Sequence, residues 1–408
     1  MKFDETSLYN IKTAIPGTRI PLFDLATWKN GLAFKKIDFA TTGIPVIKIA
    51  ELNNGIGSNT SFTQGDYGEE VRLHKGDILF SWSGNPETSI DVYRYQFLDG
   101  WLNQHIFKVT ADEDMVTKDF LFYLLKYLKP HFTQIAINKQ TTGLGHVTIG
   151  DLKRMSVVVP DKDIQDRIVS IEKALDDKIE VNAEINKNLE QQAMNLFKSW
   201  FIDYEAFNAK VPNTWRDGVL GDFVEIKRGG SPRPIQNYLS DSGLHWLKIS
   251  DATGITSPFI NEIKEYIIED GLKKTVLLKA GDLVLSNSAT PGLPKILDVD
   301  TCIHDGWLYF PSSKFSNEYL YLYFKHIRYK LIALGNGSVF TNLKTDILKN
   351  YPIYLPTDDV LNEFNSIVKP IFSMILSKTR ESKRLTEIRD TLLSKLMSGE
   401  LDVSNIDL

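Results

Sequence analysis

The sequence predicts an α+β protein built from two similar halves, each with one globular domain and one long helix. Three observations support this prediction. Short motifs recur about 200 residues apart in the 408-residue chain. Each copy begins with short β-like runs separated by Gly, Asn, Asp and Pro. Each copy also ends in a stretch of about 40 residues with the apolar periodicity of a helix.

The composition excludes several classes of protein. A hydrophobic fraction of 42% and a charged fraction of 24% are typical of globular proteins and exclude general disorder. The single cysteine, Cys302, excludes an internal disulfide and a Cys-rich zinc site. The N-terminal residues lack the apolar run of a signal peptide, and no apolar run approaches the ~18 residues of a membrane span. We therefore expect a cytoplasmic protein with no membrane partner.

The internal repeat rests on five pairs of short motifs. The first pair begins at Gly43 and Gly243, each followed by a β-like run that ends in Lys-Ile and a small residue. The spacing between paired motifs drifts between 195 and 206 residues, as loop insertions would produce, and it predicts a pseudo-two-fold repeat. The other pairs begin at Leu73 and Leu278, at Gly100 and Gly306 (which aligns Trp101 with Trp307), at Asp119 and Glu318, and at Asp151 and Asp346.

The globular segments are predicted over 18–160 and 216–356. Short β-like runs indicate a strand-rich core in each, accompanied by one helical stretch. In the first segment the clearest β-like runs are 44–49, 77–82 and 153–159. The helical stretch is 118–128 in the first segment and 317–334 in the second. We expect a linker at 206–215 and peripheral segments at 1–17 and 401–408.

Two long helices are predicted, a central helix over 161–205 and a distal helix over 357–400. In both, apolar residues recur in steps of three and four, which marks a heptad-like seam. Asn182 interrupts the first seam, and Pro370 predicts a kink in the second helix. We predict that the two helices pair as an antiparallel coiled coil. The alternative is a pair of ordinary amphipathic helices, each packed on its own domain.

The acidic charge of the chain belongs to the central helix. Residues 161–205 contain six basic and eleven acidic side chains, a net charge of −5 that equals the net charge of the whole chain. The globular segments are therefore nearly neutral, and the acidic total does not exclude contact between them and DNA. The helix presents either a solvated face or an acidic surface for a protein partner.

Catalytic motifs are absent apart from one weak pattern. The sequence has no phosphate-binding Gly-x4-Gly-Lys-Ser/Thr loop, no Asn/Asp-Pro-Pro-aromatic motif, no His-Glu-x2-His and no Gly-x-Ser-x-Gly. Asp251, Glu262 and Lys264 have the Asp…Glu-x-Lys form of Mg²⁺-dependent nucleases, but the first repeat lacks a copy. We expect no catalysis by this chain.

Several loops carry amide, hydroxyl and basic side chains, the groups that contact base edges and phosphates in DNA. An ordinary solvent-exposed loop is the alternative explanation for each of them. The candidate DNA contacts in the first globular segment are Lys29, Lys35, Lys36, Trp82, Ser83, Asn85, Lys139, Gln140, Thr141, Thr142 and His146. Those in the second are Lys227, Arg228, Arg233, Asn287, Ser288, Asn336, Ser338, Thr341, Asn342 and Lys344.

The order of these features resembles that of the specificity subunit of type I restriction–modification systems. The repeat itself, the strand over 75–79 and the loop that begins Gln140-Thr-Thr-Gly match the family pattern. Residues 189–203 are similar to the family's central conserved region, and residues 392–400 to its distal conserved region. The resemblance extends over nearly the full chain.

This resemblance implies DNA recognition without catalysis. Residues 18–160 and 216–356 would be target-recognition domains, each reading one half of a split site in double-stranded DNA. The two helices would separate these domains and dock two methyltransferase subunits, which carry S-adenosylmethionine. Restriction subunits, which combine a motor and a nuclease and use Mg²⁺ and ATP, would join for cleavage. This chain itself would hold no cofactor and no metal.

Two other functions stay open at this point. The chain is alternatively a non-catalytic scaffold, with two protein-interaction modules on paired helices. The less favoured alternative is a Mg²⁺-dependent nuclease that uses Asp251, Glu262 and Lys264. Co-purification with a methyltransferase subunit and protection of a bipartite duplex distinguish DNA recognition from the scaffold, and cleavage of DNA by the isolated chain tests the nuclease.

Overall fold

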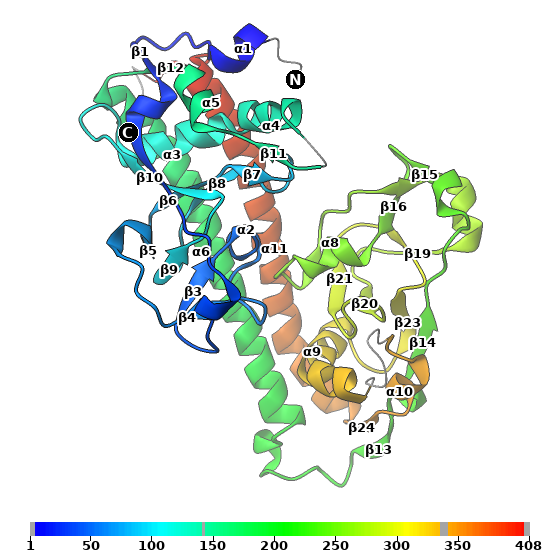
Figure 1. The fold of residues 1–408 in the computed structure, drawn as a ribbon. Coiled ribbons are helices and arrows are strands. Elements are labelled where there is room, and N and C mark those ends of the chain that lie inside the picture. Colours follow the sequence, from blue (N-terminus) through cyan, green and yellow to red (C-terminus); the bar gives the residue numbers. More distant parts are fainter. Residues whose placement is uncertain (1–4, 141–142, 335–341, 404–408) are drawn as a thin grey trace. The chain divides into compact units, whose positions relative to one another are not determined.

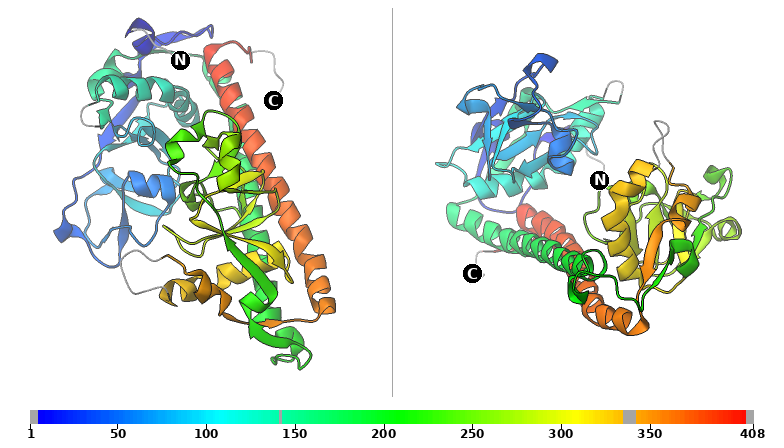
Figure 2. Two further views of the ribbon diagram at one scale, coloured as in Figure 1. Left: turned by 90° about the vertical axis from the view of Figure 1, so that its right-hand side faces the viewer. Right: turned by 90° about the horizontal axis from the view of Figure 1, so that it is seen from below.

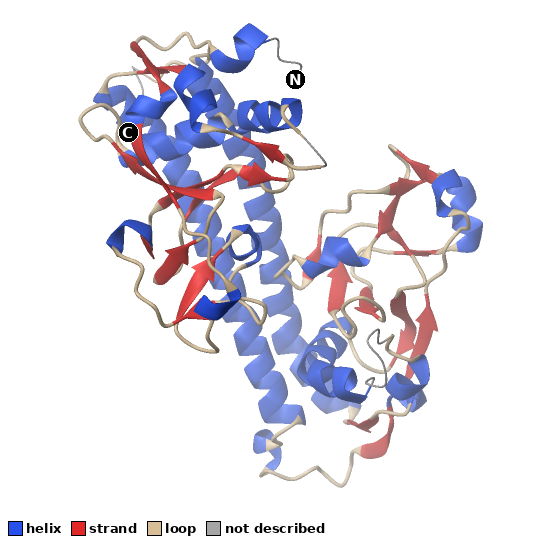
Figure 3. Cartoon of the chain, viewed as in Figure 1, coloured by secondary structure: helices blue, strands red, loops and turns tan. Residues whose placement is uncertain are grey.

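The computed structural model describes residues 5–140, 143–334 and 342–403. Its contacts divide the chain into a first unit, residues 1–177 with 385–408, and a second unit, residues 178–384. Both boundaries fall inside long helices, so each unit contains one globular domain and one part of each helix. Helices and strands contribute to both units (Figure 3). This mixed content agrees with the predicted α+β class.

The strands of the first unit form two four-stranded sheets and two strand pairs within its described residues (Figure 1). The strands are β1 (Thr18–Pro21), β2 (Ala26–Asn30), β3 (Ile44–Ile47), β4 (Phe62–Thr63), β5 (Arg72–His74), β6 (Ile78–Ser81), β7 (Ser83–Gly84), β8 (Asp91–Arg94), β9 (Asp99–Leu102), β10 (Ile106–Ala111), β11 (Gly145–His146) and β12 (Ser156–Val159). One sheet is antiparallel with the order β2-β10-β6-β8. The other has the order β4-β3-β9-β5, in which β3 and β9 run parallel. The pairs are β1-β12 and β11-β7.

The first unit has more helices than the one stretch that was predicted. The single helical stretch expected over 118–128 is followed at once by a second helix, which has Pro130 in its first turn, where a missing N–H is tolerated. The helices are α1 (Glu5–Tyr9), α2 (Ile49–Asn54), α3 (Lys118–Tyr127), α4 (Lys129–Asn138) and α5 (Ile149–Arg154), with 3₁₀ turns η1 (Leu22–Leu25), η2 (Lys36–Asp38) and η3 (Glu69–Val71).

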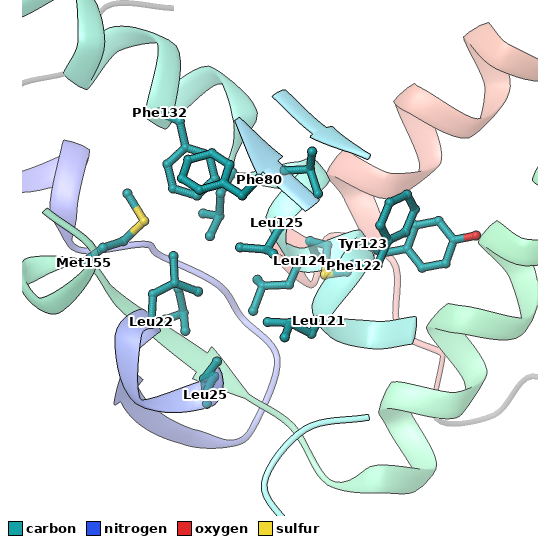
Figure 4. Packing of buried hydrophobic residues seen from close by; sticks show 14 of the residues in the cluster. Leu22, Leu25, Phe80, Leu121, Phe122, Tyr123, Leu124, Leu125, Phe132 and Met155 are labelled. Carbon is teal, nitrogen blue, oxygen red and sulfur yellow. The ribbon is translucent and has the colours of Figure 1, made fainter. Parts of the chain in front are cut away.

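The core of the first unit lies between the antiparallel sheet and helices α3 and α4 (Figure 4). The Phe80 ring from β6 packs against Phe132 from α4, with 4.7 Å between ring centroids. Each such buried side chain contributes about 1.5–3 kcal/mol to folding. The N-terminal segment was expected to be peripheral, and this is wrong for its apolar residues, because Leu8 and Ile11 are buried in this core. Val403, near the other end of the chain, is buried there too.

The second unit contains two five-stranded sheets and one strand pair within its described residues. Its strands are β13 (Arg216–Val219), β14 (Val224–Arg228), β15 (Leu239–Ser240), β16 (Leu244–Leu247), β17 (Phe259–Ile260), β18 (Tyr266–Ile267), β19 (Val276–Leu278), β20 (Leu283–Ser286), β21 (Pro294–Leu297), β22 (Thr301–Ile303), β23 (Trp307–Ser313) and β24 (Pro352–Leu355). The sheet orders are β14-β23-β20-β21-β17 and β15-β18-β16-β22-β19, and β13 pairs with β24.

The helices of the second unit include the one that the sequence predicted most closely. The helix α9 (Asn317–Leu334) has the expected bounds. The predicted linker is anchored to the unit, since Trp215 is buried and its ring centroid lies 5.1 Å from that of Phe207. The other helices are α7 (Leu220–Phe223), α8 (Ile249–Thr253) and α10 (Thr345–Lys349), with 3₁₀ turns η4 (Glu205–Phe207), η5 (Ile235–Asn237) and η6 (Glu269–Lys274).

The two units repeat one strand topology but with a different register from the predicted alignment. The order β2-β10-β6-β8 recurs as β14-β23-β20-β21, and β4-β3-β9-β5 recurs as β18-β16-β22-β19. Val46 pairs with Trp101 in the first unit, whereas Trp246 pairs with Cys302 in the second. Cys302 therefore occupies the place of Trp101, and the alignment of Trp101 with Trp307 is wrong. Trp307 begins β23 instead, where it corresponds to Ile106.

The long helices are α6 (Lys162–Phe201) and α11 (Asp358–Ser398), with 40 and 41 residues. In both units, α6 and α11 residues lie in the apolar core of the globular domain. The two helices also contact each other within each unit (Figure 2). Each long helix therefore packs on the globular domains and also contacts the other long helix. The helix α11 continues through Pro370, whose ring is exposed.

Candidate nucleic-acid interface

Three separate segments of the first unit meet at one edge of its antiparallel sheet. Because β10 lies between β2 and β6 and runs antiparallel to both, the ends of β2 and β6 flank the beginning of β10. This places Asn30, Trp82 and His105 together. The Trp82 indole Nε1 donates a hydrogen bond to Asn30 Oδ1 at 3.0 Å, and the Trp82 ring centroid lies 5.2 Å from that of His105.

The short pair β11-β7 adds a fourth segment to this edge. His146 Nδ1 lies 2.8 Å from Ser83 Oγ, and Val147 N donates to the Trp82 carbonyl at 2.9 Å. Burial, reinforced by the neighbouring His146, lowers the pKa of His105. We call the set Asn30, Trp82, Ser83, Gln104, His105 and His146 the first junction. Its exposed amides and its half-buried indole are groups that contact base edges and base faces.

The second unit has a junction at the equivalent sheet edge. There β23 lies between β14 and β20, and both pairings are antiparallel. Arg228, the last residue of β14, donates from Nε to the Asp305 carbonyl at 2.5 Å. Asn287 follows β20, where its N–H donates to the Gly306 carbonyl at 2.8 Å and its own carbonyl accepts from Leu343 N at 2.7 Å. We call the set Arg228, Asn287, Ser288, Asp305, Gly306 and Asn342 the second junction.

Asp305 organises the loop next to the second junction. Its carboxylate accepts a hydrogen bond from Ser231 Oγ at 2.6 Å and lies 3.3 Å from Arg233 Nη2. The Ser231 hydrogen bond and, to a lesser extent, the charge of Arg233 lower the pKa of Asp305 despite its partial burial. Arg233 itself is exposed. The result is two arginines, Arg228 and Arg233, that are held on one aspartate with their guanidinium groups exposed.

Some predicted lysine contacts already have acidic partners. Lys29 pairs with Glu70, and Lys227 lies 2.8 Å from Glu225. Lys139 Nζ lies 2.5 and 2.6 Å from the two carboxylate oxygens of the buried Asp151. Lys139 supports a buried charge, whereas the pairs that Lys29 and Lys227 form are largely exposed and contribute little to stability. Any role of these lysines in DNA binding stays a prediction.

The remaining candidates fall into two groups. Lys35, Lys36, Gln140 and Lys344 are exposed, and Asn85 is an exposed residue whose Oδ1 accepts from the backbone N–H groups of Glu87 and Thr88. Thr141, Thr142, Asn336, Ser338 and Thr341 lie outside the described residues. Their predicted contacts stay predictions.

Sequence reasoning did not select Asn30, Gln104, His105 or Asp305. A signal for Asn30 was present, because Lys29-Asn30-Gly31 recurs as Lys227-Arg228-Gly229. Both glycines are required by close packing. A Cβ on Gly31 would lie 2.1 Å from the Asn103 carbonyl oxygen, and one on Gly229 would lie 2.3 Å from that of His304.

The alternative nuclease residues do not form a described metal cluster. Asp251 accepts a hydrogen bond from the Lys248 backbone N–H at 2.9 Å, at the start of α8. Across the described residues, no group of three or more His, Cys, Asp or Glu side chains is placed to hold a metal ion. Among the helices described, none is both long enough and apolar enough to cross a membrane.

Comparisons with known proteins match the chain twice to one domain family. The family model described as the type I restriction modification DNA specificity domain matches residues 19–191 and 212–387. The type I restriction enzyme HindI specificity subunit of Haemophilus influenzae is 26% identical, over 81% of this chain and 87% of that protein. The MjaIX specificity subunit of Methanocaldococcus jannaschii is 25% identical, over 74% of this chain and 73% of that protein.

A solved structure has the same fold. The S subunit of a type I restriction–modification system from M. genitalium aligns with a TM-score of 0.53 at 16% identity, covering 95% of this chain and 97% of that one. The two family matches together span most of the chain, and each includes one globular domain and most of the long helix that follows it. The chain therefore belongs to the type I restriction–modification DNA specificity family.

Proposed function

We propose that this chain is the sequence-specificity subunit of a type I restriction–modification complex. Each globular domain reads one half of a split site in double-stranded DNA, and the chain performs no catalysis of its own. The observation that carries the proposal is the presence of two DNA specificity domains in one chain, at 19–191 and 212–387. Two DNA specificity domains in one chain fit a target that consists of two separate half-sites, one for each domain.

The geometry of each domain supports this function. Each presents a junction of amide, aromatic or guanidinium groups where the central strand of one sheet, β10 or β23, begins. Such groups discriminate bases, whereas lysines such as Lys35, Lys36 and Lys344, which are exposed, suit phosphates. The near-neutral charge of the domains is compatible with DNA binding in which a few lysine and arginine side chains contact phosphates.

The long helices act in this proposal as the separator of the two half-sites. At 1.5 Å per residue, the 40 residues of α6 span about 60 Å, which compares with ~34–36 Å per turn of B-DNA. We propose an antiparallel coiled coil with pseudo-two-fold symmetry. In support, Asp176 contacts Arg389 in the first unit, and Asn186 contacts Thr379 in the second. The residue number on α11 therefore decreases as the residue number on α6 increases, as expected for antiparallel helices.

The acidic helix is the proposed docking surface for the methyltransferase subunits. Its acidic residues include several that are exposed in the structure: Asp166, Asp177, Glu180 and Glu184. Two methyltransferase subunits supply S-adenosylmethionine in this proposal, and restriction subunits with Mg²⁺ and ATP join for cleavage. No residue of this chain is assigned to these cofactors.

Methylome mapping tests the proposal directly. The full chain is co-expressed with its methyltransferase subunit in a host that lacks both, and methylated bases are mapped across the genome. The expected result is one bipartite motif with a fixed gap, absent from a control host that expresses the methyltransferase subunit alone. A stable complex that methylates no bipartite motif would contradict the proposal and favour the scaffold.

A further inference from the structure

The end of strand β2 in the first unit and the end of β14 in the second are the same position in the repeated topology. Asn30 pairs with Phe107 on β10, and Arg228 pairs with Leu308 on β23. The next residue is a glycine in each case, and its N–H donates to the carbonyl of the first residue of the central strand, Ile106 or Trp307. Asn30 and Arg228 are therefore structurally equivalent residues with different side chains.

Both side chains are exposed, and each is held in place by one hydrogen bond to a neighbouring segment of the chain. Asn30 Oδ1 accepts from the Trp82 indole at 3.0 Å, and Arg228 Nε donates to the Asp305 carbonyl at 2.5 Å. A side chain held in this way loses less conformational freedom on binding than a free one, which favours affinity and precise placement. The groups that hold them come from different places in the repeated topology: the Trp82 side chain follows β6, whereas the Asp305 backbone carbonyl precedes β23.

The atoms that remain unpinned match one base each. The Asn30 amide keeps its Nδ2 donors and one lone pair on Oδ1, which is the set that pairs with adenine N7 and N6. The Arg228 guanidinium keeps both terminal nitrogens, which suit the guanine acceptors O6 and N7. We propose that this position is a base-reading position in both domains, with Asn30 selecting adenine and Arg228 selecting guanine.

This inference rests on the proposed function and extends it to individual residues. Two domains with one backbone frame read different half-sites only if exposed side chains on that frame differ. At this position they do differ, while the supporting residues are similar: Gly31 matches Gly229, and a buried apolar residue, Phe107 or Leu308, lies opposite. The lysine that precedes each, Lys29 or Lys227, is the same and carries no information that distinguishes the two domains.

The experiment uses the full chain in complex with its methyltransferase subunit and duplex libraries that are randomised in one half-site. Arg228→Asn should lower the preference for guanine at one position of one half-site by about 10- to 100-fold, and leave the other half-site unchanged. Asn30→Arg should remove the adenine preference at one position of the opposite half-site. Trp82→Phe keeps an aromatic ring but removes the N–H donor, and should relax the same adenine position as Asn30→Arg.

The neighbouring lysines supply matched controls. Lys227→Ala and Lys29→Ala change the adjacent residue on the same strands, and should weaken binding to all duplexes alike without changing base choice. Both the duplexes retained by the complex and those methylated are sequenced, so a variant that no longer methylates still reports its base preference.

The possible outcomes separate this inference from the proposed function. If Arg228→Asn and Asn30→Arg complexes retain the wild-type preference at every position, the inference is overturned and the proposed function stands. If the wild-type complex shows no base preference in either half-site, the proposed function itself fails. A change confined to one position of one half-site for each variant establishes the assignment.

Discussion

Arg389 on α11 donates a hydrogen bond from Nη1 to Asp176 Oδ1 on α6 at 2.8 Å, near a carboxyl group for which the described residues supply no hydrogen-bond partner. That carboxyl group belongs to Glu172, one turn earlier on α6, which is fully buried and whose two oxygens accept no hydrogen bond within the described residues. Tyr123 from α3 also donates to Asp176, at 2.8 Å. Three elements of the first unit therefore meet at a site with two carboxyl groups, Glu172 and Asp176, where the charge of Arg389 opposes the rise in the pKa of Glu172.

Replacing this arginine should destabilise the first unit. Arg389→Met keeps much of the aliphatic packing but leaves Asp176 and Asp390 without their cation. Because these groups are partly exposed, we expect a loss of about 1–2 kcal/mol in the free energy of unfolding rather than the larger cost of a fully buried pair. Urea unfolding measures the change. Arg384→Met, at an exposed position of the same helix, should change stability by less than about 0.5 kcal/mol, and an equal loss in both variants would contradict this account.

Glu172 should make the first unit less stable as the pH rises. Burial, with a smaller contribution from Asp176, raises the pKa of Glu172 to about 8 from its ordinary value of 4.5. Between these two values the unfolded chain loses the proton while the folded chain keeps it, so the free energy of unfolding falls as pH increases and its contribution levels off above about pH 8. Glu172→Gln should remove this slope and stabilise the protein at pH 8 by up to about 4 kcal/mol, since one pKa unit corresponds to about 1.4 kcal/mol.

Unfolding at pH 5 and at pH 8 checks this prediction. The matched control is Glu184→Gln, an exposed carboxyl group on the same helix, which should leave the wild-type slope intact. If Glu172→Gln has the same pH dependence as the wild type, the buried carboxyl group does not titrate in this range. Retained complex formation with the methyltransferase subunit shows that the variant is folded.

Substitution of Lys139 and of Lys344 should distinguish a lysine that stabilises the fold from one that contacts DNA. Burial alone would raise the pKa of Asp151, but hydrogen bonds from Lys139, Thr148 and Arg154 outweigh it and lower this pKa well below its usual range. Lys139→Gln therefore weakens the support of a buried charge and should cost about 1–3 kcal/mol of stability. Lys344→Gln, at an exposed position, should leave stability unchanged.

DNA binding as a function of salt gives the second readout for these two lysines. If Lys344 contacts a phosphate, Lys344→Gln should reduce the slope of log K against log salt by about 1. An unchanged slope would remove Lys344 from the set of phosphate contacts. A Lys139→Gln variant as stable as the wild type would show instead that Asp151 is supported sufficiently by its other partners.

The long helices and α9 could be predicted because their signals are local. Apolar residues at steps of three and four placed α6 and α11 within a few residues of their ends, and the helical stretch predicted over 317–334 has the bounds of α9. The repeat predicted the number of domains because its short motifs can be recognised in the sequence itself. The paired motifs that begin at Gly43 and Gly243, for example, lie on equivalent strands, β3 and β16.

The register of the sheets and the junctions could not be predicted in this way. Trp101 and Trp307 are both fully buried after a glycine, so local pattern does not distinguish the β9 position from the β23 position. Asn30 and Trp82 are 52 residues apart and meet only because β10 pairs with β2 and β6 at once. Contacts set by long-range strand pairing depend on a topology that single motifs do not encode.

The length of the helix pair should set the gap between the half-sites. This length can be changed at helix positions that lie between the contacts of the two units. In the second unit, Glu190 on α6 contacts Lys325, and Lys383 on α11 contacts the Asn261 carbonyl. In the first unit, Asp176 on α6 contacts Arg389 on α11. A heptad inserted after Glu180 in α6, together with one after Arg384 in α11, lies between these regions and keeps both seams in phase.

Seven residues add about 10.5 Å of helix, which corresponds to about three base pairs at ~3.4 Å each. We therefore expect the double insertion to methylate the same two half-sites with a gap about three base pairs longer. A heptad in α6 alone should instead abolish methylation at any fixed gap, because it shifts contacts such as that between Asn186 and Thr379 out of register. Methylome mapping of both variants decides the matter: an unchanged gap in the double insertion would mean that the helices do not measure the distance between half-sites.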